Sequence, residues 1–336
     1  MNMTKWLRDA LAAPAKKAMP ILSFPSVQLM DITVRELISS SEKQAQGMKA
    51  VADKVDSLAS VSLMDLSVEA ECFGAQIRIF DEEVPTVVGS IVSSLSEAEN
   101  LAVPPVGAGR TGLYLESIQK AAILITDRPV LAGVIGPFSL AGRLMDVTEA
   151  MLYCYDNPVM VHILLEKVTQ FTIAYCKAYQ SVGANGIVIA EPLAGLLSPA
   201  LAAEFSAPYV KKIVEELRSE SFAVVYHNCG NSVPAMMDSI LTVGADAYHF
   251  GNAVRLPDLI PLIPTDKLIM GNLDPAGILR GGNPTLVREA TTALLRACAA
   301  HPNYIPSSGC DIPPMTPWEN IEAFFGAVAD FYAHAE

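Results

Sequence analysis

The chain has 336 residues, of which 51% are hydrophobic and 18% are charged, so it is long enough to bury a large core. Its formal net charge of -13 argues against a nucleic-acid surface, and no stretch of about 18 apolar residues predicts a membrane span. Residues 1–20 lack the apolar block of a signal peptide, and six cysteines are too few for a disulfide scaffold. We therefore expect a globular protein of the reducing cytoplasm, with neither nucleic acid nor membrane as a partner.

The first expected element is a helical extension within residues 1–18, where Trp6, Leu7, Ala10 and Leu11 have helical spacing. Eight short apolar runs follow along the chain, and each suits a strand that is buried on both faces of a parallel sheet. The runs span residues 19–24, 58–64, 130–136, 186–190, 222–226, 245–250, 267–271 and 304–308.

Helical patterns lie between most of these runs. Ser198 and Pro199 suit the cap and first turn of one helix, and Gly244 closes another. The predicted segments span residues 152–181 (one or two helices), 198–219, 233–243, 284–300 and 317–334. Residues 72–88 break the alternation with a period-two pattern and an acidic turn, which predicts an inserted β-hairpin.

Eight strands that alternate with helices predict a (β/α)8 TIM barrel, formed as a single domain over residues 1–336. An open doubly wound sheet is the alternative, although no G-x-G-x-x-G motif follows any strand. In such barrels the chemistry lies at the carboxyl ends of the strands. The polar side chains expected to ring that mouth are Asp65, Glu191, His227, Cys229, Asn272, Asp274 and Cys310.

Three of these residues suit a metal ion. His227 and Cys229 are two residues apart at a strand end and therefore point the same way, and barrel closure would bring Cys310 toward them. A mixed histidine and cysteine set selects zinc, and three protein ligands leave one coordination position open. The alternatives are buried packing residues or a structural zinc with His249 or Asp311 as its fourth ligand.

Two thiolate ligands would weaken the Lewis acidity of zinc toward water. Such an ion is suited to holding an incoming thiol as a thiolate, which is the nucleophilic form. We therefore expect alkylation of a thiol, including methyl transfer to sulfur, and keep hydrolysis by zinc-bound water as the alternative.

Several motifs resemble those of the uroporphyrinogen decarboxylase superfamily. The similarity extends over most of the chain and is strongest around the predicted metal ligands. It rests on residues 69–74, 136–138, 183–192, 226–231, 271–275 and 308–320. This resemblance implies a distorted (β/α)8 barrel, in agreement with the strand count.

The superfamily has two branches with different chemistry. Its decarboxylases carry an arginine-rich segment after the first strand, whereas residues 23–30 contain no arginine here. They also have a histidine where this chain has Cys310. The zinc methyltransferases of corrinoid-dependent pathways share a His-x-Cys pair and a distant cysteine, which match His227, Cys229 and Cys310.

The methyltransferase resemblance implies transfer of a methyl group between a corrinoid (methylcobalamin) on a partner protein and a small acceptor. The expected acceptor is a thiol such as coenzyme M, activated as a zinc thiolate. Its sulfonate would need a cation, and the candidates are Arg143, Arg255 and Arg280. The alternatives are a decarboxylase-type lyase, transfer from a methyl donor to the corrinoid protein, transfer to tetrahydrofolate, and a binding protein without turnover.

The roles predicted for the remaining residues at the barrel mouth are less specific. As catalytic candidates, Glu191 would approach the metal or hold substrate, and Asn272 and Asp274 would support a metal ligand. Solvated rim and turn-capping positions are their alternatives. The cofactor-binding candidates, each with a packing or structural alternative, are Tyr226, His249 and Asp65, and Glu71 is a weaker candidate.

Overall fold

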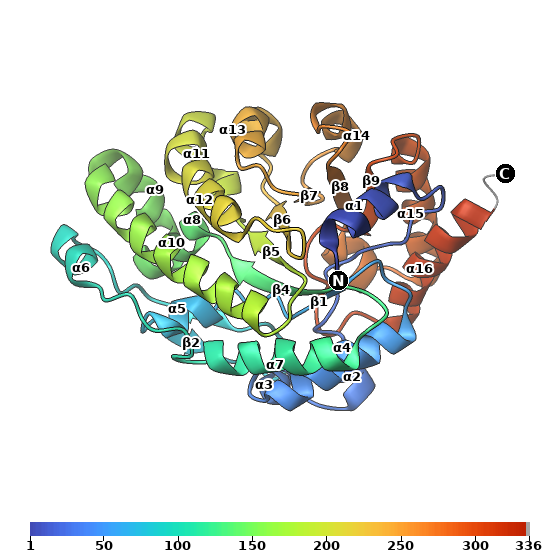
Figure 1. Ribbon diagram of the computed structural model, residues 1–336, viewed down its shortest axis with the longest axis horizontal. Coiled ribbons are helices and arrows are strands. Elements are labelled where there is room, and N and C mark those ends of the chain that lie inside the picture. The colour runs from blue at the N-terminus through green and yellow to red at the C-terminus, as the bar shows by residue number, and fades with distance from the viewer. Residues whose placement is uncertain (334–336) are drawn as a thin grey trace.

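The computed structural model describes residues 1–333 and contains a curled parallel sheet with the strand order β1-β4-β5-β6-β7-β8-β9 (Figure 1). The strands are β1 (Ser60–Val61), β4 (Val130–Ile135), β5 (Gly186–Ala190), β6 (Ala223–Asn228), β7 (Ala247–Phe250), β8 (Leu268–Leu273) and β9 (Tyr304–Ser308). Seven of the predicted strands are therefore confirmed, with shifted bounds. All of their carboxyl ends open on the same side, because every pairing in this sheet is parallel.

The predicted strand at residues 19–24 is wrong, because this segment is extended but belongs to no strand. It nevertheless joins the two edges of the sheet. The Met19 N–H donates to the Pro306 carbonyl at 2.9 Å, and the Leu58 N–H donates to the Ala18 carbonyl at 2.8 Å. The segment thus lies between β9 and β1 and completes a distorted (β/α)8 barrel, as predicted.

Prolines explain why this closing segment does not form a regular ladder. Pro20 and Pro306 have no backbone N–H, so neither can donate to a neighbouring strand. Serine hydroxyls take over part of the pairing, since Ser308 Oγ accepts from the Ile21 N–H at 3.2 Å and Ser23 Oγ donates to a β1 carbonyl. The barrel is therefore closed partly by side chains.

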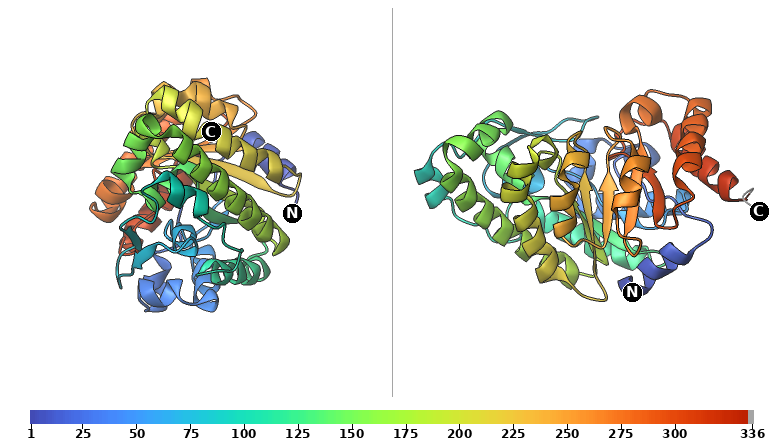
Figure 2. Two further views of the ribbon diagram at one scale, coloured as in Figure 1. Left: turned by 90° about the vertical axis from the view of Figure 1, so that its left-hand side faces the viewer. Right: turned by 90° about the horizontal axis from the view of Figure 1, so that it is seen from above.

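Helices surround the sheet, with α4 and α7 on one side and α9 to α14 on the other (Figures 1 and 2). The helices are α1 (Met3–Ala12), α2 (Ser26–Met30), α3 (Val34–Ile38), α4 (Ser41–Lys54), α5 (Val68–Cys72), α6 (Leu95–Asn100), α7 (Thr111–Leu124), α8 (Pro137–Met145), α9 (Val147–Asp156), α10 (Pro158–Ser181), α11 (Pro199–Phe205), α12 (Ala207–Leu217), α13 (Met237–Thr242), α14 (Leu256–Leu259), α15 (Pro284–Cys298) and α16 (Trp318–Ala333). Short turns add η1 (Ala194–Leu196), η2 (Val233–Met236), η3 (Ile260–Leu262) and the π-helical η4 (Pro275–Arg280). Over the described residues, none of these helices is long and apolar enough to cross a membrane.

Most of the predicted helices are confirmed, and two of them divide. The segment 152–181 belongs to α9 and α10. The segment 198–219 divides at Ser206 because Pro208, in the first turn of α12, has no N–H to continue the ladder of α11. The predicted helix 317–334 corresponds to α16, and residue 334 lies outside the described residues.

The N-terminal helix α1 packs against the amino-terminal end of the barrel. The Asn2 side chain caps it by accepting from the Lys5 N–H at 2.7 Å. Met3 and Ala10 are buried with inward-facing strand side chains such as Val225. The predicted hairpin is also present, as the antiparallel pair β2 (Gln76–Arg78) and β3 (Thr86–Val88). Both additions to the barrel are therefore confirmed.

Candidate metal centre

The barrel brings the three predicted metal ligands together. His227 lies in β6, Cys229 follows the end of that strand, and Cys310 lies just beyond β9. Their ligand atoms are all within 4.8 Å of one another, and Cys310 Sγ is 3.5 Å from His227 Nε2. Within residues 1–333 this is the only group of three or more histidine, cysteine or carboxylate side chains with such spacing.

A chain of hydrogen bonds behind His227 determines which of its nitrogens is free. Ser307 Oγ donates to the Met19 carbonyl at 2.8 Å, and its single proton is thereby committed. His249 Nε2, 2.8 Å from that hydroxyl, must therefore be the donor, which leaves His249 Nδ1 as an acceptor. His227 Nδ1 lies 2.7 Å from that acceptor and so carries the proton. The Nε2 lone pair of His227 consequently faces Cys310, in the tautomer that a metal ligand needs.

The two thiols are not equivalent. Hydrogen bonding from Cys310 lowers the pKa of Cys229, and His227 adds to the effect, whereas the same hydrogen bond raises the pKa of Cys310. Burial holds the pKa of His249 well below its usual value, so this ring is neutral behind the site. A metal ion would bind both cysteines as thiolates, and with the unprotonated Nε2 of His227 they form a donor set that suits zinc.

Glycines allow the backbone to surround Cys229 closely. A Cβ at Gly251 would lie 2.5 Å from the Cys229 Cβ, and a Cβ at Gly195 would lie 2.5 Å from the Gly230 Cα. Larger residues at either position would therefore displace the Cys229 loop. This packing fixes the direction of the second ligand, and nothing in the sequence pattern predicted it.

The predicted fourth ligands of a structural zinc are not available in the described residues. Both ring nitrogens of His249 are engaged in hydrogen bonds, and Asp311 does not belong to the group of convergent ligand atoms. The residues present thus fit an ion with three protein ligands and one open position, which is the catalytic pattern.

Glu191 lies next to the centre but is engaged elsewhere. It is fully buried, and its carboxylate accepts from the Phe138 N–H at 2.9 Å, the Ser139 N–H at 3.0 Å and Ser139 Oγ at 2.7 Å. Burial raises the pKa of Glu191 to about 7, against donors that favour its ionised form. Its backbone N–H also donates to the His227 carbonyl at 2.8 Å, so this residue links the start of α8 to β6.

The other two catalytic candidates hold loops at the mouth. Asn272 Nδ2 donates to the Gly251 and Val254 carbonyls, both at 2.9 Å, and so secures the loop that packs on the second ligand. Asp274 Oδ1 accepts from the N–H groups of Ala276 and Gly277, also at 2.9 Å, and caps η4. These contacts suit supporting roles for both residues.

Tyr226 and His249 take different positions. Tyr226 points to the helix-facing side of β6, where it is buried and its hydroxyl accepts from Asn228 Nδ2 at 3.0 Å. This placement favours packing over contact with a corrinoid. His249 is 1% exposed and contacts the centre only through His227, which gives it a positioning role.

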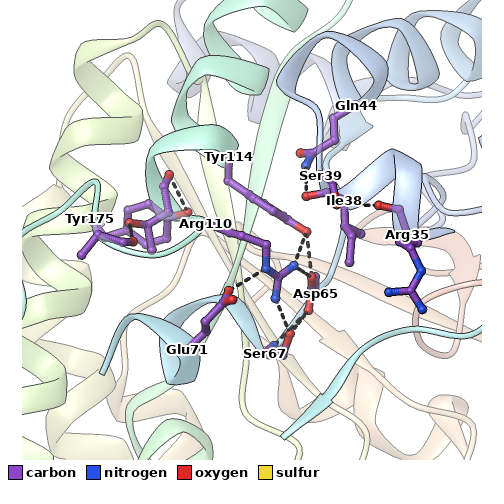
Figure 3. Close-up of polar contacts among 12 residues, drawn as sticks. Arg35, Ile38, Ser39, Gln44, Asp65, Ser67, Glu71, Arg110, Tyr114 and Tyr175 are labelled. Carbon is purple, nitrogen blue, oxygen red and sulfur yellow. Dashed lines mark hydrogen bonds and ion pairs between the residues drawn. The ribbon is translucent and has the colours of Figure 1, made fainter. Parts of the chain in front are cut away.

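Asp65 belongs to a network around Arg110 (Figure 3). Arg110 donates to Asp65 at 2.5 Å, to Glu71 at 2.6 Å and to Ser67 at 2.8 Å. The Tyr114 hydroxyl donates to the same carboxylate of Asp65 at 2.8 Å. The network ties the segment after β1 to the start of α7, so Asp65 and Glu71 hold the wall of the mouth.

Sequence reasoning did not identify Arg110, Ser307 or Ser139. Arg110 follows a glycine-rich stretch directly before a helix, and that position was a usable signal. The two serines gave no signal, because a hydroxyl acquires its role from the atoms around it.

Comparisons with known proteins agree with this architecture. A sequence profile described as "Uroporphyrinogen decarboxylase (URO-D)" matches residues 13–331. Methylcobamide:CoM methyltransferase MtbA from Methanosarcina acetivorans is 28% identical over 338 residues, which cover 95% of this chain and 97% of that relative. A uroporphyrinogen decarboxylase from Coxiella burnetii is 27% identical over 291 residues, which cover 81% of this chain and 77% of that relative.

A solved structure described as a methyltransferase from Methanosarcina mazei is similar over 99% of both chains. The TM-score is 0.88 at 23% sequence identity, which supports the barrel fold independently of the strand count. Because the family profile spans nearly the whole sequence, the chain belongs to the uroporphyrinogen decarboxylase family.

Proposed function

We propose that this protein is a zinc-dependent methyltransferase that moves a methyl group between a corrinoid on a partner protein and a small thiol such as coenzyme M. The observation that carries the proposal is the convergence of His227, Cys229 and Cys310 within 4.8 Å. The methyltransferase names of relatives from Methanosarcina species support it. We further propose a single domain over residues 1–336 and a cytoplasmic location, where cysteines stay reduced.

The reaction forms one bond and breaks one bond. The acceptor thiol loses its proton to solvent, and its sulfur attacks the methyl carbon of the methylcorrinoid. A carbon–sulfur bond forms while the cobalt–carbon bond breaks, and that electron pair remains on cobalt. A zinc ion held by His227, Cys229 and Cys310 would supply the charge that keeps the acceptor sulfur deprotonated near neutral pH.

The surrounding residues keep this donor set in place. His249 and Ser307 hold the His227 ring in the required tautomer. Glu191 fixes α8 against the end of β6. None of these residues has to exchange a proton with substrate, which suits a transfer in which the nucleophile is already ionised.

Demethylation of methylcobalamin tests the proposal. Purified protein is incubated with methylcobalamin and with coenzyme M, other thiols or tetrahydrofolate, and loss of the methylated form is followed by absorbance. We expect turnover with a thiol and close to one zinc per chain. Turnover with tetrahydrofolate alone would change the acceptor, and activity in metal-free protein would overturn the mechanism.

Cysteine variants link the activity to the centre. Cys310→Ser should lower both zinc retention and methyl transfer by at least about 100-fold, since removal of a ligand exceeds the effect of removing its support. The control is Cys298→Ser in α15, because Cys298 is buried in the core away from the ligand group. Equal losses in the two variants would assign the effect to folding.

Decarboxylation of uroporphyrinogen is the second candidate. The URO-D profile and the Coxiella relative favour it, whereas the lack of arginine in residues 23–30 opposes it. A uroporphyrinogen turnover assay on the same preparation separates the two. A protein that retains zinc but turns over neither substrate would be a binding protein.

A further inference from the structure

Arg143 is a partly buried cation without a fixed partner. It lies in α8, and every other residue of this helix is buried. In the described part of the chain its guanidinium makes no ion pair, and its buried Nε has no hydrogen-bond partner. A charge withdrawn from water without a partner is destabilising, so this position is suited to a ligand rather than to the fold alone.

The two carboxylates whose charges act on Arg143 form hydrogen bonds with other groups. Burial lowers the pKa of Arg143, and the charges of Asp65 and Glu69 oppose that effect. Asp65 is held by Arg110 and Tyr114. Glu69 accepts from a β4 N–H, and burial raises its pKa to about 7, so much of it is uncharged near neutral pH. Within residues 1–333, no anion is therefore dedicated to Arg143.

The position of Arg143 relates it to the metal centre. Glu69, one of the two carboxylates that act on Arg143, accepts from the Ile135 N–H at 3.1 Å, at the carboxyl end of β4. The start of α8 is fixed by Glu191, whose N–H is bonded to the His227 carbonyl. Arg143 and the metal ligands therefore belong to the same mouth of the barrel.

We propose that Arg143 binds the anionic end of the acceptor, a sulfonate or carboxylate, while the acceptor sulfur lies at the metal centre; this rests on the proposed function. A guanidinium presents a rigid fork of donors that matches two oxygens of such a group. The other arginines considered for this role are unsuitable, because Arg255 pairs with Asp258 and Arg280 pairs with Glu83 on the exposed surface.

A binding experiment tests this assignment without zinc or turnover. The melting temperature of metal-free protein is measured with ethanesulfonate, with propionate and with ethanol as the uncharged probe. We expect the anions to raise the melting temperature of the wild type and not that of Arg143→Met. The exposed Arg255→Met is the control and should behave like the wild type. Equal shifts in wild type and Arg143→Met would overturn the assignment, whatever the outcome for methyl transfer.

A kinetic experiment tests its consequence for specificity. Arg143→Met should raise the KM for coenzyme M by about 10- to 100-fold, which is the effect of losing one hydrogen bond to a charged group. The KM for 2-mercaptoethanol, which has no anionic group, should not change. Arg143→Lys should recover part of the loss. Equal changes for both thiols, or a higher KM for methylcobalamin alone, would contradict the assignment. A wild type that methylates neither thiol would instead refute the proposed function, and the binding experiment would still decide the role of Arg143.

Discussion

At the residue scale, the central feature is the direction of the hydrogen bonds behind His227. The Met19 carbonyl can only accept a hydrogen bond, so Ser307 must donate to it. This fixes the donor and the acceptor in the hydrogen bonds between Ser307 and His249 and between His249 and His227. The free nitrogen of His227 thus follows from a backbone carbonyl of the closing segment. The irregular part of the barrel therefore contributes to the chemistry of its mouth.

Removing this support should weaken metal binding without removing a ligand. His249→Phe leaves the His227 Nδ1–H without an acceptor, and we expect zinc affinity to fall by about 10- to 100-fold. Competition with a chromophoric chelator measures the change. His162→Phe, on α10 and partly exposed, is the matched control and should bind zinc normally. Wild-type affinity in the His249 variant would show that the tautomer needs no support.

Glu69 should make stability depend on pH. Burial raises its folded-state pKa from 4.5 to about 7, so between these values the folded protein binds more protons than the unfolded chain. Its stabilising contribution is complete below pH 4.5 and is lost as the pH rises through about 7, by at most about 1.4 kcal/mol per pH unit.

The test compares Glu69→Gln with the wild type in denaturant titrations at several pH values. Because the amide does not titrate, the variant should gain stability relative to the wild type as the pH rises from 5 to 8. A constant difference across this range would show that Glu69 titrates normally. Comparing the two proteins cancels the contributions of all other groups.

The sequence predicted the convergence of His227, Cys229 and Cys310 because it follows from the regular geometry of strands and barrels. Residues two apart on a strand share a face, and strand ends of a barrel share a mouth, so His227, Cys229 and Cys310 could be related without coordinates. Arg110 and Ser307 could not be assigned in this way, since their partners come from distant segments. The hydrogen bond that Glu191 accepts from the start of α8 could not be predicted either, because its donor also lies in a distant segment.

At the scale of elements, the turns after β5 and β7 hold the ligand loop through close backbone contact. Gly251→Ala should displace Cys229, because the added Cβ would lie 2.5 Å from the Cys229 Cβ. We expect loss of zinc affinity that is larger than the loss of stability. Zinc titration and denaturant unfolding of the same variant measure the two effects.

A second glycine provides the control at the opposite end of the sheet. A Cβ at Gly186, where β5 begins, would collide with the Ala223 carbonyl. Gly186→Ala should therefore lower the free energy of unfolding while the folded fraction keeps its zinc affinity. If both variants lost zinc in proportion to stability, the glycines would have no specific role at the metal centre.

The strand prediction for residues 19–24 was wrong because it depended on how this segment pairs with its neighbouring elements. Length and apolar character are the same for a strand and for an extended segment that lacks regular pairing. A regular ladder forms only where backbone N–H donors are available on the facing edges, and Pro20 and Pro306 remove two of these donors. The split of the helix at Ser206 has the same origin in Pro208. Proline positions were visible in the sequence, but their partners were not.

At the scale of the whole molecule, the barrel interior is covered by α1 at the end opposite the metal centre. Met3 is 1% exposed and packs with the inward-facing strand side chains. Met3→Ala should lower the free energy of unfolding by about 2–5 kcal/mol, as for other buried large-to-small changes. Denaturant titration measures this, and the exposed Leu152→Ala should change it by less than about 0.5 kcal/mol. Equal effects would show that α1 does not stabilise the barrel.

Zinc K-edge X-ray absorption tests the central claim, that His227, Cys229 and Cys310 hold one ion with a position open to a thiol. The account predicts two sulfur neighbours in the wild type, one in Cys310→Ser, and a third in the wild type when coenzyme M is added. A zinc environment without sulfur, or one that the thiol leaves unchanged, would contradict it.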